Sequence, residues 1–456
     1  MTSADEPRFP DRRTRTVAWR GLLVGVVAQL SYTFAITGPA FLIPHLRAQE
    51  GFTLAQGGMV GTATSIGMVL TLVAWGAMSD RRGERLALVL GLFLSGTAAA
   101  MGLLLVWADL VHSPLALVLV LAAVGAAGSS VNTATGRIVA GWFPRSMRGT
   151  AMGVRQMALP LGTAIAAVLV PPLADAWGLL GFFAVSLVLC LISGVACRVG
   201  IVDPPRPSGT TVTGSPADDA GLAEAPEASP ATASRATSPV AARTGDPAAD
   251  PGASTTAPAA ASADVNPYRA DSFLWRIHTV SALLVVPQAT FATFGLVWLI
   301  DTQHLGASTA GLLVGAAQLL GALARLTMGS VSDRAPSRVL VLRWVAWSAA
   351  VLTASVAVVS LGVLPVLAGV LFGLASAASV ADNGLAFTSI AEAAGNRWSG
   401  KAMGIQNTGQ HVLSAAVGPG IGGLISAVGY PIALGAVAVI PVLASFLVPR
   451  RDLERV

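Results

Sequence analysis

Long apolar stretches and short polar stretches alternate along the chain from Gly21 to near its end. Each apolar stretch is about 20 residues long, the length that an α-helix needs to cross a bilayer. The stretches lack the alternation of a β-strand, and lipid accommodates only helices or closed barrels. The pattern therefore predicts twelve membrane-spanning helices. They are expected at residues 21–44, 55–78, 87–107, 115–140, 151–173 and 180–200, and at 275–301, 309–330, 339–361, 365–390, 401–427 and 430–448.

The polar segment between the two groups of spans has a composition of its own. Residues 204–270 consist mainly of Ala, Pro, Ser, Thr, Gly and Asp, with almost no aromatic or large aliphatic side chain. Such a segment cannot bury enough surface to offset the entropy lost on ordering, which predicts a disordered linker. The expected organisation is a tail (1–20), a six-helix bundle (21–203), the linker (204–270), a second six-helix bundle (271–448) and a tail (449–456).

The composition excludes two broad functional classes. Hydrophobic residues make up 54% of the 456 residues and charged residues 11%, whereas soluble domains carry about a quarter charged residues. An ordinary soluble enzyme and a nucleic-acid-binding protein are therefore excluded. No nucleophile–base set and no metal-ligand spacing occurs in any span or loop, and Cys190 and Cys197 lie in one apolar run. We expect neither an enzymatic activity nor a cofactor nor a metal.

The basic residues predict the orientation in the membrane. Of 28 Lys and Arg residues, Arg47 alone falls on the predicted outer side, and Arg137, Arg155 and Arg325 fall within spans. The other 24 lie in the two tails and in the loops of the opposite side. Cytoplasmic loops carry the excess of Lys and Arg, so both termini are expected in the cytoplasm. The net charge of +5 thus reflects topology and indicates no nucleic-acid partner.

The two groups of spans are related by an internal repeat. The segment RGTAMGVRQ, which begins at Arg148, is matched by SGKAMGIQN, which begins at Ser399, at an offset of 251 residues. At the same offset Asn132 in the fourth span corresponds to Asn383 in the tenth. Such a duplication is typical of secondary transporters, in which the solute site lies between two halves that move about it.

The loop between the second and third spans carries a more specific signature. It reads GAMSDRRGER from Gly76, and a degenerate copy begins at Gly329 in the loop between the eighth and ninth spans. With these motifs the chain resembles the major facilitator superfamily over its whole length apart from the linker. The resemblance implies an all-α membrane fold of twelve helices in two pseudo-symmetric six-helix bundles. It also implies a cytoplasmic gate formed by Gly76, Asp80, Arg81, Gly83, Arg85, Gly329, Asp333 and Arg334.

Arginines inside the spans are candidates for solute binding, because charge within a bilayer is costly. Arg155 lies seven residues beyond Arg148, about 10 Å along its helix. We expect it to hold an anionic group of the solute; the alternative is a structural ion pair. Arg325 lies in GALARLTMG, which resembles the eighth helix of nitrate and nitrite porters, where this Arg binds the anion. The Arg of their second helix has no counterpart here, so a structural role for Arg325 stays open.

One acidic residue lies well inside a predicted span. Asp382 is the single case among 23 Asp and Glu residues, and we expect it to carry the proton as its surroundings alternate. The alternatives are a fixed salt bridge to Arg325 and a hydrogen-bonded kink next to Asn383 and Gly384. His411 is a second titratable candidate in the eleventh span.

Polar residues near these charges complete the predicted solute site. They are Asn132, Gln156, Tyr32, Gln288, Asn383, Gln406 and Asn407. The run GVRQMALPLG, which begins at Gly153, is similar to the fifth helix of bacterial cyanate and nitroimidazole permeases.

These features predict a monomeric transporter of the plasma membrane, embedded in lipid. It would move a small anionic organic solute by alternating access, with protons as the coupling ion. One alternative is an exporter of drugs or metabolites that works as a proton antiporter. An alternative from another class is a non-transporting membrane sensor that signals through the linker.

Overall fold

The computed structural model describes residues 9, 11–110, 112–204, 266–335 and 337–451, and these residues form helices joined by short loops, with no strand among them. The first half contains α1 (Arg12–Phe41), α2 (Ile43–Gln49), α3 (Leu54–Arg82), α4 (Glu84–Trp107), α5 (Pro114–Trp142) and α6 (Arg145–Gly200). The second half contains α7 (Pro267–Ala270), α8 (Phe273–Gln303), α9 (Ala307–Arg334), α10 (Arg338–Val359), α11 (Pro365–Val380) and α12 (Asp382–Leu447).

Two of the helices cross the membrane more than once. Ten helices of the described part of the chain are long and apolar enough to cross a membrane. The stretches Gly153–Gly200 and Lys401–Leu447 have 48 and 47 residues, about twice the length that one crossing needs. Each is interrupted by a glycine with positive φ, Gly178 at 59° and Gly429 at 78°, a conformation that glycine adopts without strain. The predicted twelve membrane-spanning helices are therefore confirmed.

The ends of the two halves differ from the prediction in two places. Helix α1 begins at Arg12, within the expected tail, because the Asp11 carboxylate caps it by accepting a hydrogen bond from the Thr14 backbone. Helix α7 lies inside the segment expected to be a disordered linker. It contains Tyr268, whose ring packs against the second half. The remainder of the predicted linker, 205–265, lies outside the described residues.

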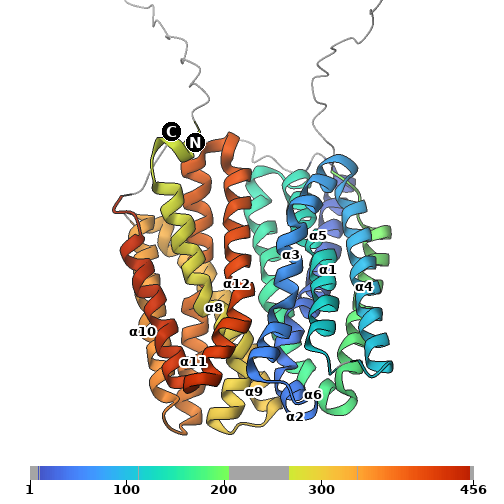
Figure 1. The fold of residues 1–456 in the computed structure, drawn as a ribbon. Coiled ribbons are helices and arrows are strands. Elements are labelled where there is room, and N and C mark those ends of the chain that lie inside the picture. The colour runs from blue at the N-terminus through green and yellow to red at the C-terminus, as the bar shows by residue number, and fades with distance from the viewer. Residues whose placement is uncertain (1–8, 10, 111, 205–265, 336, 452–456) are drawn as a thin grey trace, which may run out of the picture. The chain divides into compact units, whose positions relative to one another are not determined.

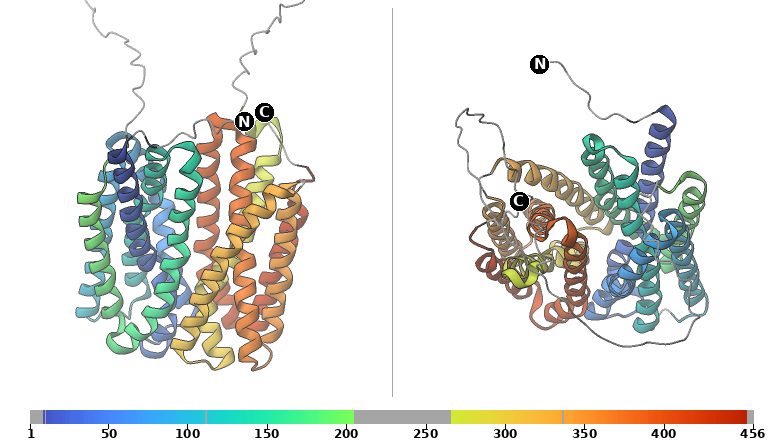
Figure 2. Two further views of the ribbon diagram at one scale, coloured as in Figure 1. Left: turned by 180° about the vertical axis from the view of Figure 1, so that it is seen from behind. Right: turned by 90° about the horizontal axis from the view of Figure 1, so that it is seen from above.

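The two halves form two pseudo-symmetric bundles, one of α1–α6 and one of α7–α12 (Figures 1 and 2). We call the end at which α1 begins and α12 ends the terminal side; it is the upper side in Figure 1. The opposite end, where α2 lies, is the distal side.

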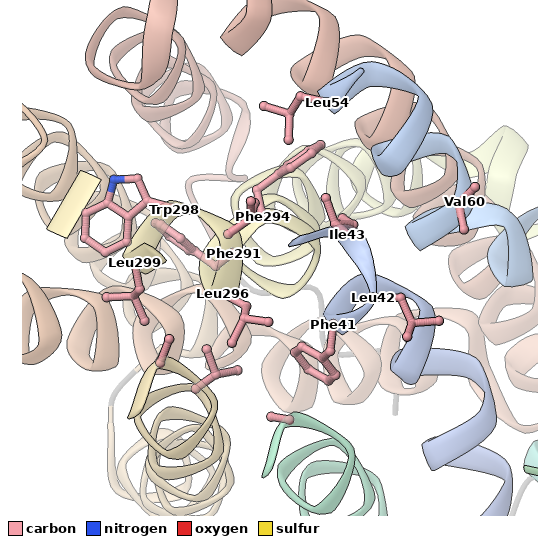
Figure 3. Packing of buried hydrophobic residues seen from close by; sticks show 14 of the residues in the cluster. Phe41, Leu42, Ile43, Leu54, Val60, Phe291, Phe294, Leu296, Trp298 and Leu299 are labelled. Carbon is pink, nitrogen blue, oxygen red and sulfur yellow. The ribbon is translucent and has the colours of Figure 1, made fainter. Parts of the chain in front are cut away.

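An apolar cluster joins the two bundles on the distal side. Phe41 and Ile43 of the N-terminal bundle and Phe291 and Phe294 of the C-terminal bundle belong to one continuous set of buried side chains (Figure 3). The clusters nearer the terminal side each belong to a single bundle. Burial of apolar surface therefore holds the bundles together mainly in their distal halves.

Glycines allow the closest approach between the bundles. A side chain at Gly58 of α3 would collide with the carbonyl oxygen of Gly418 in α12 and with the Phe294 ring. Nearby, the Thr62 hydroxyl donates to the Ala415 carbonyl oxygen across 3.3 Å. We call this contact of α3 with α12 the distal seal. A related contact of α6 with α9 places Gly311 against the backbone of Ala167, so the same kind of contact recurs at the position related by the repeat.

The same helix faces are uncovered nearer the terminal side. Gly153 lies 11 residues before Ala164, which contacts Gly315 of α9, and 11 residues are about three helical turns. Gly404 is likewise 11 residues before Ala415. A side chain built at Gly153 or Gly404 would meet no described atom within 4 Å. Among the described residues, no atom of the opposite bundle therefore covers Gly153 of α6 or Gly404 of α12 on the terminal side.

Candidate functional site

Arg155 occupies the N-terminal bundle at the level where the bundles separate. Helix α6 begins at Arg145, so Arg155 lies about 15 Å along it. Its Nε donates to Thr135 Oγ1 (2.8 Å), its Nη2 to the Asn132 carbonyl oxygen (2.7 Å) and its Nη1 to Gln156 Oε1 (3.0 Å). These three acceptors are neutral, and they orient the guanidinium. The structure therefore brings together three of the predicted residues, Arg155, Gln156 and Asn132.

Asn132 also bonds to a residue of α1. Gln29 Nε2 donates to Asn132 Oδ1 across 3.0 Å, and Gln29 is buried. Tyr32, one turn further along α1, is 0% exposed and packs against Gly128, and its hydroxyl has no hydrogen-bond partner among the described residues. The predicted residue Tyr32 therefore lies inside the N-terminal bundle, and Gln29 is the residue of α1 that joins the polar group.

A matching amide pair lies in the C-terminal bundle. Asn383 Nδ2 donates to Gln288 Oε1 (3.2 Å), just as Gln29 bonds to Asn132. Gln410 Nε2 lies within hydrogen-bonding distance of both Asn383 Oδ1 (3.1 Å) and Ser281 Oγ (2.8 Å). The repeat read from the sequence thus places an amide pair between equivalent helices of each half, with Asn132 and Asn383 as its equivalent members.

Asp382 lies in the tenth membrane span, where helix α11 ends at Val380 and α12 begins at Asp382. Ala381 between them has helical backbone angles, so the span runs on from Pro365 to Ala394. The Asp382 carboxyl group is 1% exposed, faces the Ser281 hydroxyl and interacts electrostatically with Arg325 of α9. Asp382 Oδ2 and Arg325 Nε are both buried without a hydrogen-bond partner among the described residues. Asp382 and Arg325 are therefore near neighbours, but among the described residues their side chains form no direct ion pair.

The eleventh span adds further polar groups on the terminal side. Gln406 is buried and its Oε1 lies 2.7 Å from His278 Nδ1 of α8. Asn407 and His411 are half-buried on the same helix. His278 and Tyr268, which bonds to it, were not among the predicted residues. The available signal was a histidine near the start of the seventh predicted span, at a position expected to lie near the headgroups.

The motif expected to form the gate joins helix ends within the N-terminal bundle. Gly83 has φ 104°, and the Asp203 carboxylate lies beside it and accepts from the Arg85 backbone N–H (2.7 Å). Glu84, which is buried, pairs with Arg137 (3.2 Å). Asp203 and Glu84 are acidic partners that the motif did not reveal. Gly76 is uncovered and Arg81 is exposed. The surroundings of Gly329 and the side chains of Asp80, Asp333 and Arg334 lie outside the described residues.

An ion pair closes the distal side between the bundles. Arg47 Nη1 of α2 lies 2.5 Å from Asp301 Oδ2 of α8, and the Tyr430 hydroxyl donates to the same oxygen across 3.2 Å. Arg47 is the single basic residue that the sequence placed on the outer side. Among the described residues, no group of three or more His, Cys, Asp or Glu is arranged to hold a metal ion.

Comparison with known proteins agrees with this architecture. Residues 25–419 match the family described as Major Facilitator Superfamily. An uncharacterized MFS-type transporter of Mycobacterium tuberculosis is 37% identical over 438 residues, which cover 95% of this chain and 85% of that protein. The glycerol-3-phosphate transporter of Bacillus subtilis is 31% identical over 160 residues, which cover 35% of this chain and 34% of that protein.

Two solved structures share the fold. A bacterial homolog of the human lysosomal transporter Spinster, in an inward-facing and occupied conformation, has a TM-score of 0.68 at 12% identity and covers 96% of both chains. A D-xylose–proton symporter has a TM-score of 0.67 at 14% identity and covers 96% of this chain and 98% of its own. At these identities the likeness concerns the fold alone.

Proposed function

The chain belongs to the major facilitator superfamily of membrane transporters, and we propose that it moves a small anionic organic solute, coupled to protons. The observation that carries the proposal is the setting of Arg155. Its guanidinium is half-buried at the level where the bundles separate, and neutral oxygens of Thr135 and Asn132 hold it in place. An arginine keeps its charge in such a setting and presents a planar set of donors that matches a carboxylate or phosphate.

The C-terminal bundle supplies the residues that we assign to proton coupling. A carboxyl group that is buried beside an arginine changes its proton affinity when the distance to that arginine changes. Asp382 and Arg325 are such neighbours, and each has a buried polar atom without a partner among the described residues. In our proposal, Asp382 takes up the proton and Arg325 contacts the anion, with His411 as a second titratable group.

The remaining predicted residues have supporting roles in the proposal. Gln156 and Asn407 lie at equivalent positions of the repeat, next to Arg155 and Gln406, and would donate to the solute. Gln288 and Asn383 would contribute from the C-terminal bundle. Tyr32 packs against Gly128 inside the N-terminal bundle, so we assign it no direct contact with the solute in this conformation.

The orientation that we propose places the terminal side in the cytoplasm. The excess of Lys and Arg on that side supports it, and a bacterial transporter of this kind belongs in the plasma membrane. The conformation described above is then open to the cytoplasm and closed to the outside. The end of α3 that contains Asp80 and the end of α9 that contains Asp333 would close the cytoplasmic side in the alternate state.

The name of one relative agrees with an anionic solute. The Bacillus subtilis protein that shares about a third of this chain is named for glycerol 3-phosphate, a phosphate monoester. The run from Gly153 to Gly162 supports a relationship to the cyanate and nitroimidazole permeases as the nearer branch.

Flux in proteoliposomes tests the proposal. Purified protein is first tested for thermal stabilisation by organic acids, inorganic anions and hydrophobic cations at two pH values. Solutes that bind are then measured for uptake with and without an imposed proton gradient. We expect an anion to accumulate against its gradient when the inside is alkaline, and Arg155→Ala to abolish uptake while the protein still inserts. Equal uptake by Arg155→Ala and wild type would remove the basis of the anion assignment.

A further inference from the structure

A chain of three hydrogen-bonded side chains connects the start of the C-terminal bundle to its interior. The Tyr268 hydroxyl of α7 lies 2.9 Å from His278 Nε2, and His278 Nδ1 lies 2.7 Å from Gln406 Oε1. Gln406 is 2% exposed. The three residues come from α7, α8 and α12, and Gln406 lies 128 residues beyond His278 in the sequence.

Aromatic packing fixes the first two members of this chain. The Tyr268 ring stacks on the His278 ring, with centroids 5.8 Å apart and an angle of 14° between the planes. Trp275 and Trp398 pack against Tyr268 at 5.2 Å and 6.3 Å. The imidazole therefore has little freedom to rotate, and a ring held on one nitrogen presents the other in a fixed direction.

The proton positions in this chain determine which end of the Gln406 amide is used. Gln406 Oε1 can only accept, so the proton of the neutral His278 ring lies on Nδ1, and Nε2 accepts from the Tyr268 hydroxyl. Nδ1–H then donates to Gln406 Oε1. The amide oxygen is thereby occupied, whereas Gln406 Nε2 is buried and has no acceptor among the described residues. A buried amide nitrogen without an acceptor is uncommon, and a bound ligand that supplies the acceptor would explain it.

The repeat places Gln406 at the position of Arg155. The two residues are 251 apart, the offset that relates the matched segments of the halves. The two donors thus occupy equivalent positions in the two bundles, at the level where the bundles separate.

We propose that Tyr268 and His278 are positioning residues that hold the Gln406 amide with its NH₂ group free to donate to the solute, opposite Arg155. The inference rests on the proposed function, because it assumes that an anion binds between the bundles. It adds that the bound group is an oxyanion, such as a carboxylate or a phosphate ester, whose oxygens accept from Arg155 on one side and from Gln406 on the other. Tyr268 and His278 do not contact the solute; they affect its binding only by orienting the Gln406 amide.

Binding measured on the purified full-length protein tests this inference. The probes are glycerol 3-phosphate, succinate and benzoate, with tetraphenylphosphonium as a hydrophobic cation, and the readout is the concentration of probe that half-saturates thermal stabilisation. We expect His278→Ala and Gln406→Ala each to weaken binding of the best oxyanion about threefold to tenfold, the range of one lost hydrogen bond. His278→Asn should stay closer to wild type because its amide can still donate to Gln406 Oε1. His304→Asn, on the exposed distal side, is the matched control.

The double variant separates positioning from a general structural role. In the Gln406→Ala background, His278→Ala and Tyr268→Phe should have no further effect on binding, because nothing remains for them to position. Weakening that adds up in the double variant, or no weakening in His278→Ala, overturns the inference while Arg155→Ala still tests the proposed function. Failure of every oxyanion to stabilise the wild-type protein overturns both.

Discussion

Because the distal seal is tightly packed, we expect a larger side chain at Gly418 to destabilise the distally closed state strongly. Gly418→Val places a β-carbon where the carbonyl oxygen of Gly58 and the Thr62 hydroxyl already lie. The backbone oxygen cannot rotate away as a flexible side chain would. The substitution therefore opposes the closed distal side specifically, and leaves helix α12 itself intact.

The size of the effect follows from the packing. Extra carbon forced into a close contact costs about 1–3 kcal/mol. Since about 1.4 kcal/mol changes an equilibrium constant tenfold, the ratio of distally closed to distally open protein should fall about 5-fold to 150-fold. Gly420 offers a matched control on the same helix, because a side chain built there meets no described atom within 4 Å. Gly420→Val should leave the ratio near its wild-type value.

Thiol labelling measures the ratio. Thr62→Cys places a reporter in the seal, where the native side chain is buried, and the native residues Cys190 and Cys197 are buried as well and give little background. A membrane-impermeant maleimide is applied from the distal side. Gly418→Val should label at least several times faster than Gly420→Val. Equal labelling rates in the two variants would show that the glycine contact does not hold the distal side closed.

Three further predictions concern charged residues. Asp301→Asn weakens the pair with Arg47 and should open the distal side by about 1 kcal/mol, seen as severalfold faster distal labelling; Arg47→Gln should then add little to Asp301→Asn. Arg155→Lys keeps the charge but loses the planar set of donors, so binding should fall between wild type and Arg155→Ala in the thermal-shift titration. Arg137→Ala should lower the melting temperature more than Glu84→Gln, because Glu84 is the buried member of that pair.

Much of the fold could be predicted because membrane insertion leaves a strong pattern in the sequence. Apolar runs of crossing length gave the helices, and Gly178 and Gly429 lie in the gaps predicted between spans. The hydrophobic pattern failed where a polar segment, expected to be disordered, in fact forms a helix. Tyr268 lies at the end of a polar, Ala- and Pro-rich segment, and its aromatic ring was too small a signal to predict α7.

The candidate site could be predicted only where a residue is unusual on its own helix. Arg155 and Asp382 are charges inside apolar spans, so their types alone singled them out. Thr135 and Ser281 are ordinary residues of membrane helices, and only the packing of the helices shows that they meet those charges. Gln29 joins the site through Asn132, which the sequence did not reveal either. A sequence fixes the spacing along one helix but not the rotation of one helix against another.

The charges break the symmetry that the amide pairs keep. The repeat matches Asn132 with Asn383, yet the residue that corresponds to Asp382 is Val131, an apolar side chain. Only the C-terminal bundle therefore has a titratable group at this position of the repeat. We expect Asp382 to couple transport to protons and not to bind the solute. Asp382→Asn, which keeps the shape but cannot release a proton, should still exchange solute between the two sides of a liposome at near wild-type rates. It should lose accumulation driven by a pH gradient. Accumulation that survives in Asp382→Asn would contradict this division of roles, because the proton would then have to be carried by another group such as His411.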